Sequence, residues 1–118
     1  MSQWKINDVE LEIDMSDAEF LERYENAFEA MGESEKELQN VGKYSEIAKR
    51  YCEMFYKLFD DIFGEGTGNH LFNGKMNCSL CEDVYDQFIM LCSEDARRVE
   101  EARQNRLKKY RPKKGRKQ

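Results

Sequence analysis

The segment YSEIAKRYCEMFYKLFDDIF, residues 44–63, carries the strongest structural signal in this chain. Its apolar residues recur every three or four positions, which is the period of an amphipathic α-helix. Three phenylalanines widen the apolar stripe, so we expect this helix to contact more than one neighbouring element. The glycine-rich run GEGTGN at residues 64–69 then ends the helix, because glycine readily adopts left-handed backbone conformations. The stripe consists of Ile47, Tyr51, Met54 or Phe55, Leu58, Phe59, Ile62 and Phe63.

A β-hairpin is predicted before this helix. Residues 4–6 and 9–13 alternate apolar with polar side chains, and the two residues Asn7-Asp8 between them suit a tight turn. An isolated hairpin is marginally stable in water, so it must pack on another element. We expect that element to be the helix that follows it.

Two more helices are expected, one on each side of residues 44–63. The first opens with the capping box Ser-Asp-Ala-Glu at residues 16–19 and continues to about Leu38. The other begins near Ser79, and its apolar pattern fades after Cys92. We therefore expect a helical extension that frays, followed by disorder from Pro112 onward. The segment around Leu71 and Phe72 is expected to return the chain and to contribute both side chains to the core.

The charge of the chain is divided sharply between two regions. Residues 97–118 hold 11 of the 19 basic residues and only two acids, whereas the other 96 residues hold 22 acids and 8 bases. The sequence therefore predicts an acidic helical domain with an N-terminal hairpin at residues 1–96 and a basic, partly disordered C-terminal arm at residues 97–118. The fold class is mainly α (α+β), with the hairpin followed by a small three-helix domain.

Composition narrows the class of protein. A hydrophobic share of 40% is that of a globular domain, and the 118 residues suffice for one modest core. No apolar run approaches the roughly 20 residues of a membrane span, and the N-terminus lacks the apolar stretch of a signal peptide. We therefore expect no membrane partner and a cytosolic protein with reduced thiols.

Cys78 and Cys81 form the sharpest candidate for a chemical site, because a C-x-x-C pair is half of a zinc site. A second such pair is needed for a strong zinc signature, and none is present. Cys52 and Cys92 lie on apolar helical faces, where cysteine behaves as a small hydrophobe. Ordinary thiols are the favoured interpretation, ahead of zinc and of a redox pair.

No other pattern indicates catalysis. His70 has no partner at a diagnostic spacing, so a loop or packing role is favoured. The glycines at residues 64–68 follow a helix instead of a strand and lack the Gly-Lys-Ser/Thr of a phosphate loop. The neighbouring acids Asp60, Asp61 and Glu65 do not match a calcium-binding loop. We expect a protein that is not an enzyme and that needs no cofactor.

The basic arm offers two kinds of partner. Its side chains could bind phosphates through counterion release, which would give nucleic-acid binding with little sequence preference. Alternatively, the arm could dock onto an acidic protein surface, including the acidic body of another copy, or it could simply increase solubility. The residues concerned are Arg97, Arg98, Arg103, Arg106, Lys108, Lys109, Arg111, Lys113, Lys114, Arg116 and Lys117.

Several stretches of the chain together resemble a known family. They are FDDIFGEGT at residues 59–67, LFNGKMN at residues 71–77, and INDVELEID at residues 6–14 leading into Tyr24-Glu25. These motifs and their order, over about residues 4–92, resemble small bacteriophage proteins of the tail-gene region that are similar to tail assembly chaperones. The motifs are structural, so they identify a family better than a function.

The resemblance implies a non-enzymatic role in virion assembly, in the host cell cytoplasm. Tail assembly chaperones coat the long, helical tape-measure protein until the major tail protein polymerises around it. A wide aromatic stripe could offer such a client a groove, although the same residues could simply fill the core. The stripe residues proposed for partner binding are Tyr51, Phe55, Tyr56, Phe59 and Phe63.

Two other classes of function remain open. One is nucleic-acid binding through the arm. The other is inhibition of a host defence enzyme, in which the acidic body would mimic the charge of nucleic acid.

Overall fold

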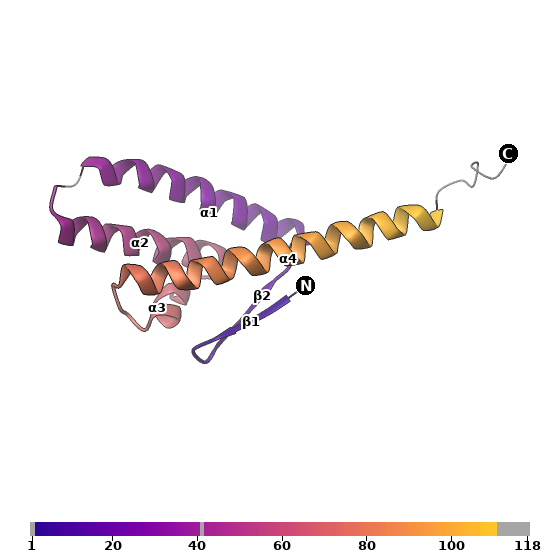
Figure 1. The fold of residues 1–118 in the computed structure, drawn as a ribbon, viewed down its shortest axis with the longest axis horizontal. Helices are drawn as coiled ribbons and strands as arrows, with labels where there is room; N and C mark the ends of the chain where they lie inside the picture. Colours follow the sequence, from indigo (N-terminus) through magenta and orange to yellow (C-terminus); the bar gives the residue numbers. More distant parts are fainter. Residues whose placement is uncertain (1, 41, 111–118) are drawn as a thin grey trace.

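The computed structural model describes residues 2–40 and 42–110. Within them, two long helices and a third, still longer one form a compact body, from which the end of the longest helix projects (Figure 1). A two-stranded hairpin lies beside the point of projection. The elements in chain order are β1 (Ser2–Ile6), β2 (Val9–Ile13), α1 (Ala18–Glu37), a 3₁₀ turn (Leu38–Asn40), α2 (Tyr44–Phe63), α3 (Thr67–Phe72) and α4 (Cys78–Tyr110).

The predicted hairpin is confirmed, but its packing partner differs from the expectation. Asn7 and Asp8 have φ values of 49° and 64°, the left-handed conformation that a two-residue hairpin turn requires. The hairpin packs mainly against α4 instead of α1. The reason is Trp4, whose ring lies 5.6 Å from that of Phe88 in α4 and 5.8 Å from that of Phe59 in α2, measured between ring centroids.

Helix α1 begins one residue later than a capping box at Ser16 requires. Asp17 is the N-cap, and its carboxylate accepts a hydrogen bond of 2.9 Å from the Phe20 amide. The Ser16 hydroxyl instead donates to the carboxylate of Asp14. The predicted role of Ser16 is therefore wrong, whereas the continuation of this helix through Gly32 to about Leu38 is confirmed.

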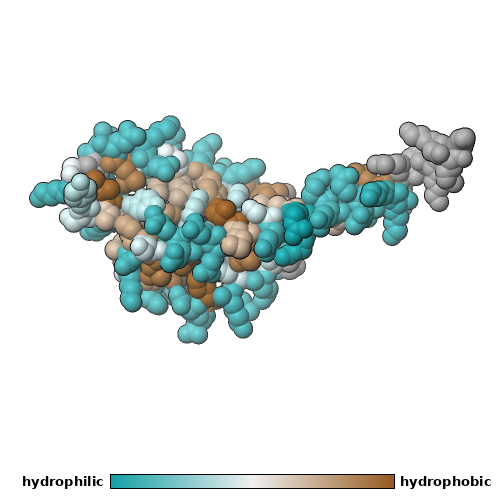
Figure 2. Space-filling model, in the orientation of Figure 1, coloured by the Kyte–Doolittle hydropathy of each residue, from teal (hydrophilic) through white to brown (hydrophobic). Residues whose placement is uncertain are grey.

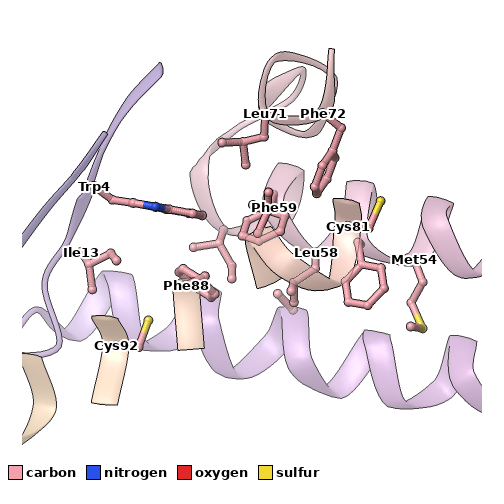
Figure 3. Packing of buried hydrophobic residues seen from close by; sticks show 14 of the residues in the cluster. Trp4, Ile13, Met54, Leu58, Phe59, Leu71, Phe72, Cys81, Phe88 and Cys92 are labelled. Atoms are coloured by element: carbon pink, nitrogen blue, oxygen red, sulfur yellow. The ribbon is translucent and has the colours of Figure 1, made fainter. Parts of the chain in front are cut away.

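The core is built around α2. Phe59, Phe72 and Phe88 come from three different helices and are completely buried. Trp4 reaches this cluster from the hairpin, as Figure 3 shows. Four separate elements are thus joined by a single set of aromatic contacts, which explains the width of the apolar stripe in the sequence.

Helix α3 is a short helix where the sequence indicated only a turn. It packs closely on α2, because a Cβ atom at Gly68 would lie 2.8 Å from both the Cα and the carbonyl oxygen of Tyr56. The Asp60 carboxylate accepts a hydrogen bond of 2.7 Å from the Gly68 amide, which fixes the start of α3. Leu71 and Phe72 are buried, as predicted.

Helix α4 runs without interruption from Cys78 to Tyr110. The expected fraying after Cys92 is not seen in the described residues. Asp95 is the last buried residue of α4, and every residue from position 100 to 110 is exposed. The part of α4 from Arg97 to Tyr110, called the arm helix below, is therefore a solvated helix that leaves the body (Figure 2). None of the described helices is both long and apolar enough to cross a membrane.

Candidate protein-interaction surfaces

The five residues of the predicted aromatic stripe are divided by the fold. Phe55 and Phe59 are core residues with exposed fractions of 2% and 0%. The rings of Phe59 and Phe88 lie edge to face, with their centroids 5.2 Å apart. A partner could not contact Phe59 unless the core opened, so this ring stabilises the fold and does not form a surface.

The other three stripe residues are half-buried and face different neighbours. Tyr51 donates a hydrogen bond of 2.7 Å to a Glu82 carboxylate oxygen, and Tyr56 donates one of 2.7 Å to the Lys75 carbonyl. Phe63 packs at the opposite end of α2, near the hairpin. The five side chains therefore do not form one continuous groove.

A different groove lies where α1, α2 and the start of α4 meet. It has a volume of about 340 Å³, and we call it the acidic groove. Apolar side chains form its floor, and Tyr51 and Phe55 among them belong to the predicted stripe. Met54 and Phe55 are almost completely buried, so the half-buried Met31, Tyr51 and Tyr85 supply most of the apolar surface. The floor consists of Met31, Tyr51, Met54, Phe55 and Tyr85, and the rim consists of Glu35, Glu82, Asp83 and Asp86.

The rim makes the groove electrostatically negative. Burial raises the pKa of Tyr85, and the negative charges of Glu35 and Asp86 raise it further. Burial also raises the pKa of Tyr51, and its hydrogen bond to Glu82 adds to the effect. In the part of the chain that the structure describes, the rim carboxylates form no ion pair, so their charge is available to a partner.

The arm helix presents basic and apolar groups together. Leu107 and Tyr110 have exposed fractions of 53% and 70%. The Arg106 guanidinium carbon lies 5.5 Å from the centre of the Tyr110 ring, within the range of a cation–π contact. Arg97 and Arg103 pair with Glu101 and Glu100 on the same helix, at 3.1 and 3.0 Å.

The predicted basic residues fall into two groups. Arg97, Arg98, Arg103, Arg106, Lys108 and Lys109 lie on the exposed arm helix. Five others, Arg111, Lys113, Lys114, Arg116 and Lys117, lie outside the described residues.

Asp95 marks the junction between body and arm helix. Its carboxylate accepts hydrogen bonds from the Ser2 hydroxyl at 3.0 Å and from the Met15 amide at 2.8 Å. Burial acts to raise the pKa of Asp95, but the favourable interactions of its carboxylate, the hydrogen bonds from Met15 and Ser2 among them, outweigh burial and hold the pKa below its ordinary value. This residue therefore ties both the hairpin and the connection between β2 and α1 to α4, and no pattern in the sequence indicates that role.

Three of the four cysteines, Cys52, Cys78 and Cys81, lie close together at the start of α4. The Sγ atoms of Cys52 and Cys78 are 3.8 Å apart, and Cys52 and Cys81 are completely buried. Burial raises the pKa of Cys52 to about 12, so its thiol is protonated at neutral pH and is a poor nucleophile and metal ligand. Among the described residues, no group of three or more Cys, His, Asp or Glu side chains is arranged to hold a metal ion.

The remaining sequence candidates lie on α2 and α3, outside the acidic groove. His70 is exposed on α3. Asp60 caps α3, and Asp61 pairs with Lys57 on the same helix at 2.7 Å.

Comparison with known proteins gives one match. No curated protein and no solved structure matches the chain. A family model does match, over residues 7–118, and its description is "Family of unknown function (DUF6673)". Since this match covers nearly the whole chain, the protein belongs to the family of unknown function DUF6673.

Proposed function

We propose that this protein is a non-enzymatic phage protein, a tail assembly chaperone that binds a helical segment of the tape-measure protein or of another tail protein. The acidic groove is the observation that carries the proposal. It combines an apolar floor with a charged rim. Most of the other aromatic side chains are buried in the core or packed against it. The resemblance of the sequence to phage tail-region proteins supplies the class of client.

The floor of the groove suits an amphipathic helix. Such helices dock through apolar side chains three or four residues apart, which enter a hydrophobic groove. The half-buried Met31 is unbranched and polarisable, so it can adapt to clients of different shape. A volume of about 340 Å³ is at the lower end of the range of roughly 300–1,000 Å³ for binding pockets. The groove therefore fits a few side chains of a helix.

The rim adds selectivity. Glu35 on α1 and Glu82, Asp83 and Asp86 on α4 line the same groove. A client helix with basic residues beside its apolar stripe would be attracted, whereas an acidic helix would be repelled. We therefore expect binding to weaken as salt is raised, without being abolished.

The proposal is tested by recovering partners from phage-producing cells with tagged protein. The groove variant is Asp83→Lys with Asp86→Lys, and its matched control is Glu22→Lys with Glu25→Lys. The control makes the same change of charge at exposed positions of α1 outside the groove. We expect mass spectrometry to find tape-measure or major tail protein with wild type and control, and to find much less with the groove variant.

The outcome that contradicts the proposal is recovery of no tail protein, or equal recovery with wild type and groove variant. Recovery of a host enzyme alone would favour the inhibitor function instead.

Exposure of Arg106, Lys108 and Lys109 on the arm helix favours nucleic-acid binding as a second candidate. That function predicts an affinity that falls steeply with salt and depends on the arm, whatever the state of the groove. Nuclease treatment of the same extract separates the two candidates, because only partners held through nucleic acid would be lost.

A further inference from the structure

The two ends of α4 carry complementary surfaces. The rim residues Glu82, Asp83 and Asp86 lie near its start, and the arm helix forms its end. We propose that the arm helix of a second copy of this chain occupies the acidic groove, so that the protein self-associates and a client must displace the arm. This inference rests on the proposed function in one respect only, namely that a client protein competes with the arm helix for the acidic groove.

The arm helix has the pattern that the groove requires. Val99, Arg103, Arg106 and Tyr110 follow one another at spacings of four, three and four residues, so they share one face, and Leu107 lies beside them. Val99 is half-buried, whereas Leu107 and Tyr110 are among the few large apolar side chains exposed in the described structure. Leu107 and Tyr110 are therefore the apolar anchors that a methionine- and tyrosine-lined floor would bury.

The charges of the two surfaces also match. Lys108 and Lys109 have no ion-pair partner among the described residues, and neither do Asp83 and Asp86. Lys109 lies about 100° around the helix from Tyr110, at the side of the apolar anchors, so it can reach Asp83 or Asp86 of a second copy. Lys108 lies about 160° away, so it adds only to the overall attraction. Arg106, already positioned over the Tyr110 ring, would add a third positive charge beside the aromatic anchor.

A single chain cannot make this contact with itself. Asp86 and Leu107 are separated by 21 residues of one continuous helix, which spans about 32 Å at roughly 1.5 Å per residue. The arm helix points away from the body along this axis (Figure 1). The groove can therefore receive an arm only from another molecule. Two copies could exchange arms reciprocally, or each arm could enter the next groove in a chain.

Charge reversal tests the contact directly. The arm variant is Lys108→Glu with Lys109→Glu, and the groove variant is Asp83→Lys with Asp86→Lys. We expect each variant alone to self-associate about tenfold more weakly than wild type in sedimentation, because the attraction between the arm helix and the rim becomes repulsion. An equimolar mixture of the two should regain association, because each variant arm then meets a groove of opposite sign.

Cross-linking supplies an independent readout. Isotopically heavy and light wild-type chains are mixed and treated with a zero-length carbodiimide, which joins a lysine amine to a carboxylate with loss of water. We expect heavy–light peptides that join Lys109 to Glu82, Asp83 or Asp86.

The inference is overturned if wild type stays at its monomer mass of 14.0 kDa at high concentration, or if the mixed variants do not regain association. The control Glu22→Lys with Glu25→Lys should associate like wild type, which excludes a general effect of charge. All substituted residues are exposed, so the variants should unfold like wild type in urea. If wild type does not self-associate but recovers tail proteins through the groove, this inference fails and the proposed function stands. If wild type self-associates through the groove but recovers no tail protein, the proposed function alone fails.

Discussion

The two halves of α4 are helical for different physical reasons. In the first half, Val84, Phe88 and Cys92 recur every four residues and are buried in the core. In the arm helix, no described residue is buried, and the helix is supported by its composition and by pairs such as Arg97–Glu101. Tertiary packing thus stabilises one half, whereas local interactions alone stabilise the other.

The contrast shows how a small domain can extend its reach. The folded first half acts as a rigid base, so the arm helix projects in a fixed direction from Asp95 onward. Nearly all the stability of the body should therefore be independent of the arm. Binding, in contrast, should depend on exposed residues whose replacement leaves the body folded.

The largest expected effect on stability comes from removing a buried side chain in the first half of α4. Phe88→Ala should lower the free energy of unfolding by about 3–5 kcal/mol, because it removes a buried ring that contacts Trp4, Phe59 and Phe63. The matched substitution in the arm helix, Leu107→Ala, should change it by no more than about 0.5 kcal/mol. Urea denaturation followed by the fluorescence of Trp4, the single tryptophan, measures both. Similar losses in the two variants would contradict the division of α4.

A smaller loss is expected at the junction. Asp95→Asn should cost about 1.5–3 kcal/mol, because the buried carboxylate loses charge-assisted hydrogen bonds from Ser2 and Met15. The pKa of Asp95 is lowered in the folded state, so its contribution is present above the ordinary pKa of a carboxyl group and is lost as pH falls through the lowered value. Urea titrations at several pH values should therefore show the two proteins converging in acid. If the difference in unfolding free energy between wild type and Asp95→Asn stayed the same at low pH, the carboxylate of Asp95 would not have this stabilising role.

Much of the contrast within α4 follows from the sequence. Regular spacing from Leu80 to Cys92 predicts a packed helix, and the basic composition after Arg97 predicts exposure. The predicted fraying is wrong, because a helix can continue where its apolar face has ended. Residues such as Ala102, Arg103 and Gln104 have strong helix propensity, and they continue a helix whose nucleation the core has already supplied.

The candidate site was less accessible to sequence reasoning. The stripe on α2 was visible, but a single helix does not reveal which of its residues its neighbours cover. Trp4 and Phe88 cover Phe59, whereas Tyr51 remains at the surface beside Glu82. The acidic groove needs α1 and α4 as its other walls, so it exists only once those helices are placed.

A helix-breaking substitution in the arm helix should disrupt the arm half of α4 and leave the half in the body folded. Ala102→Pro removes one helical hydrogen bond and introduces a steric clash, which costs a helix interior about 3 kcal/mol locally. Circular dichroism should show a loss of helix, while the free energy of unfolding of the body changes by less than about 0.5 kcal/mol. Self-association should weaken in the same variant. A large loss of body stability would show that the arm is coupled to the core.

The smallest effect is expected from a single ion pair of the arm. Arg97→Ala removes the contact with Glu101, in which both side chains are mostly exposed. Such a pair stabilises a helix by about 0.2–0.5 kcal/mol, and salt screens it. Circular dichroism at low and high salt should therefore show a slight loss of helix that disappears in high salt.

The pairing of arm and groove is tested most directly by hydrogen exchange along α4, measured on the full chain at increasing protein concentration. We predict that amides of the arm helix and of the groove segment at residues 82–86 gain protection together as concentration rises. Amides at residues 88–95 should already be protected in dilute solution and should not change. Protection of the arm helix that does not depend on concentration, or that rises while the groove segment stays constant, would contradict the pairing.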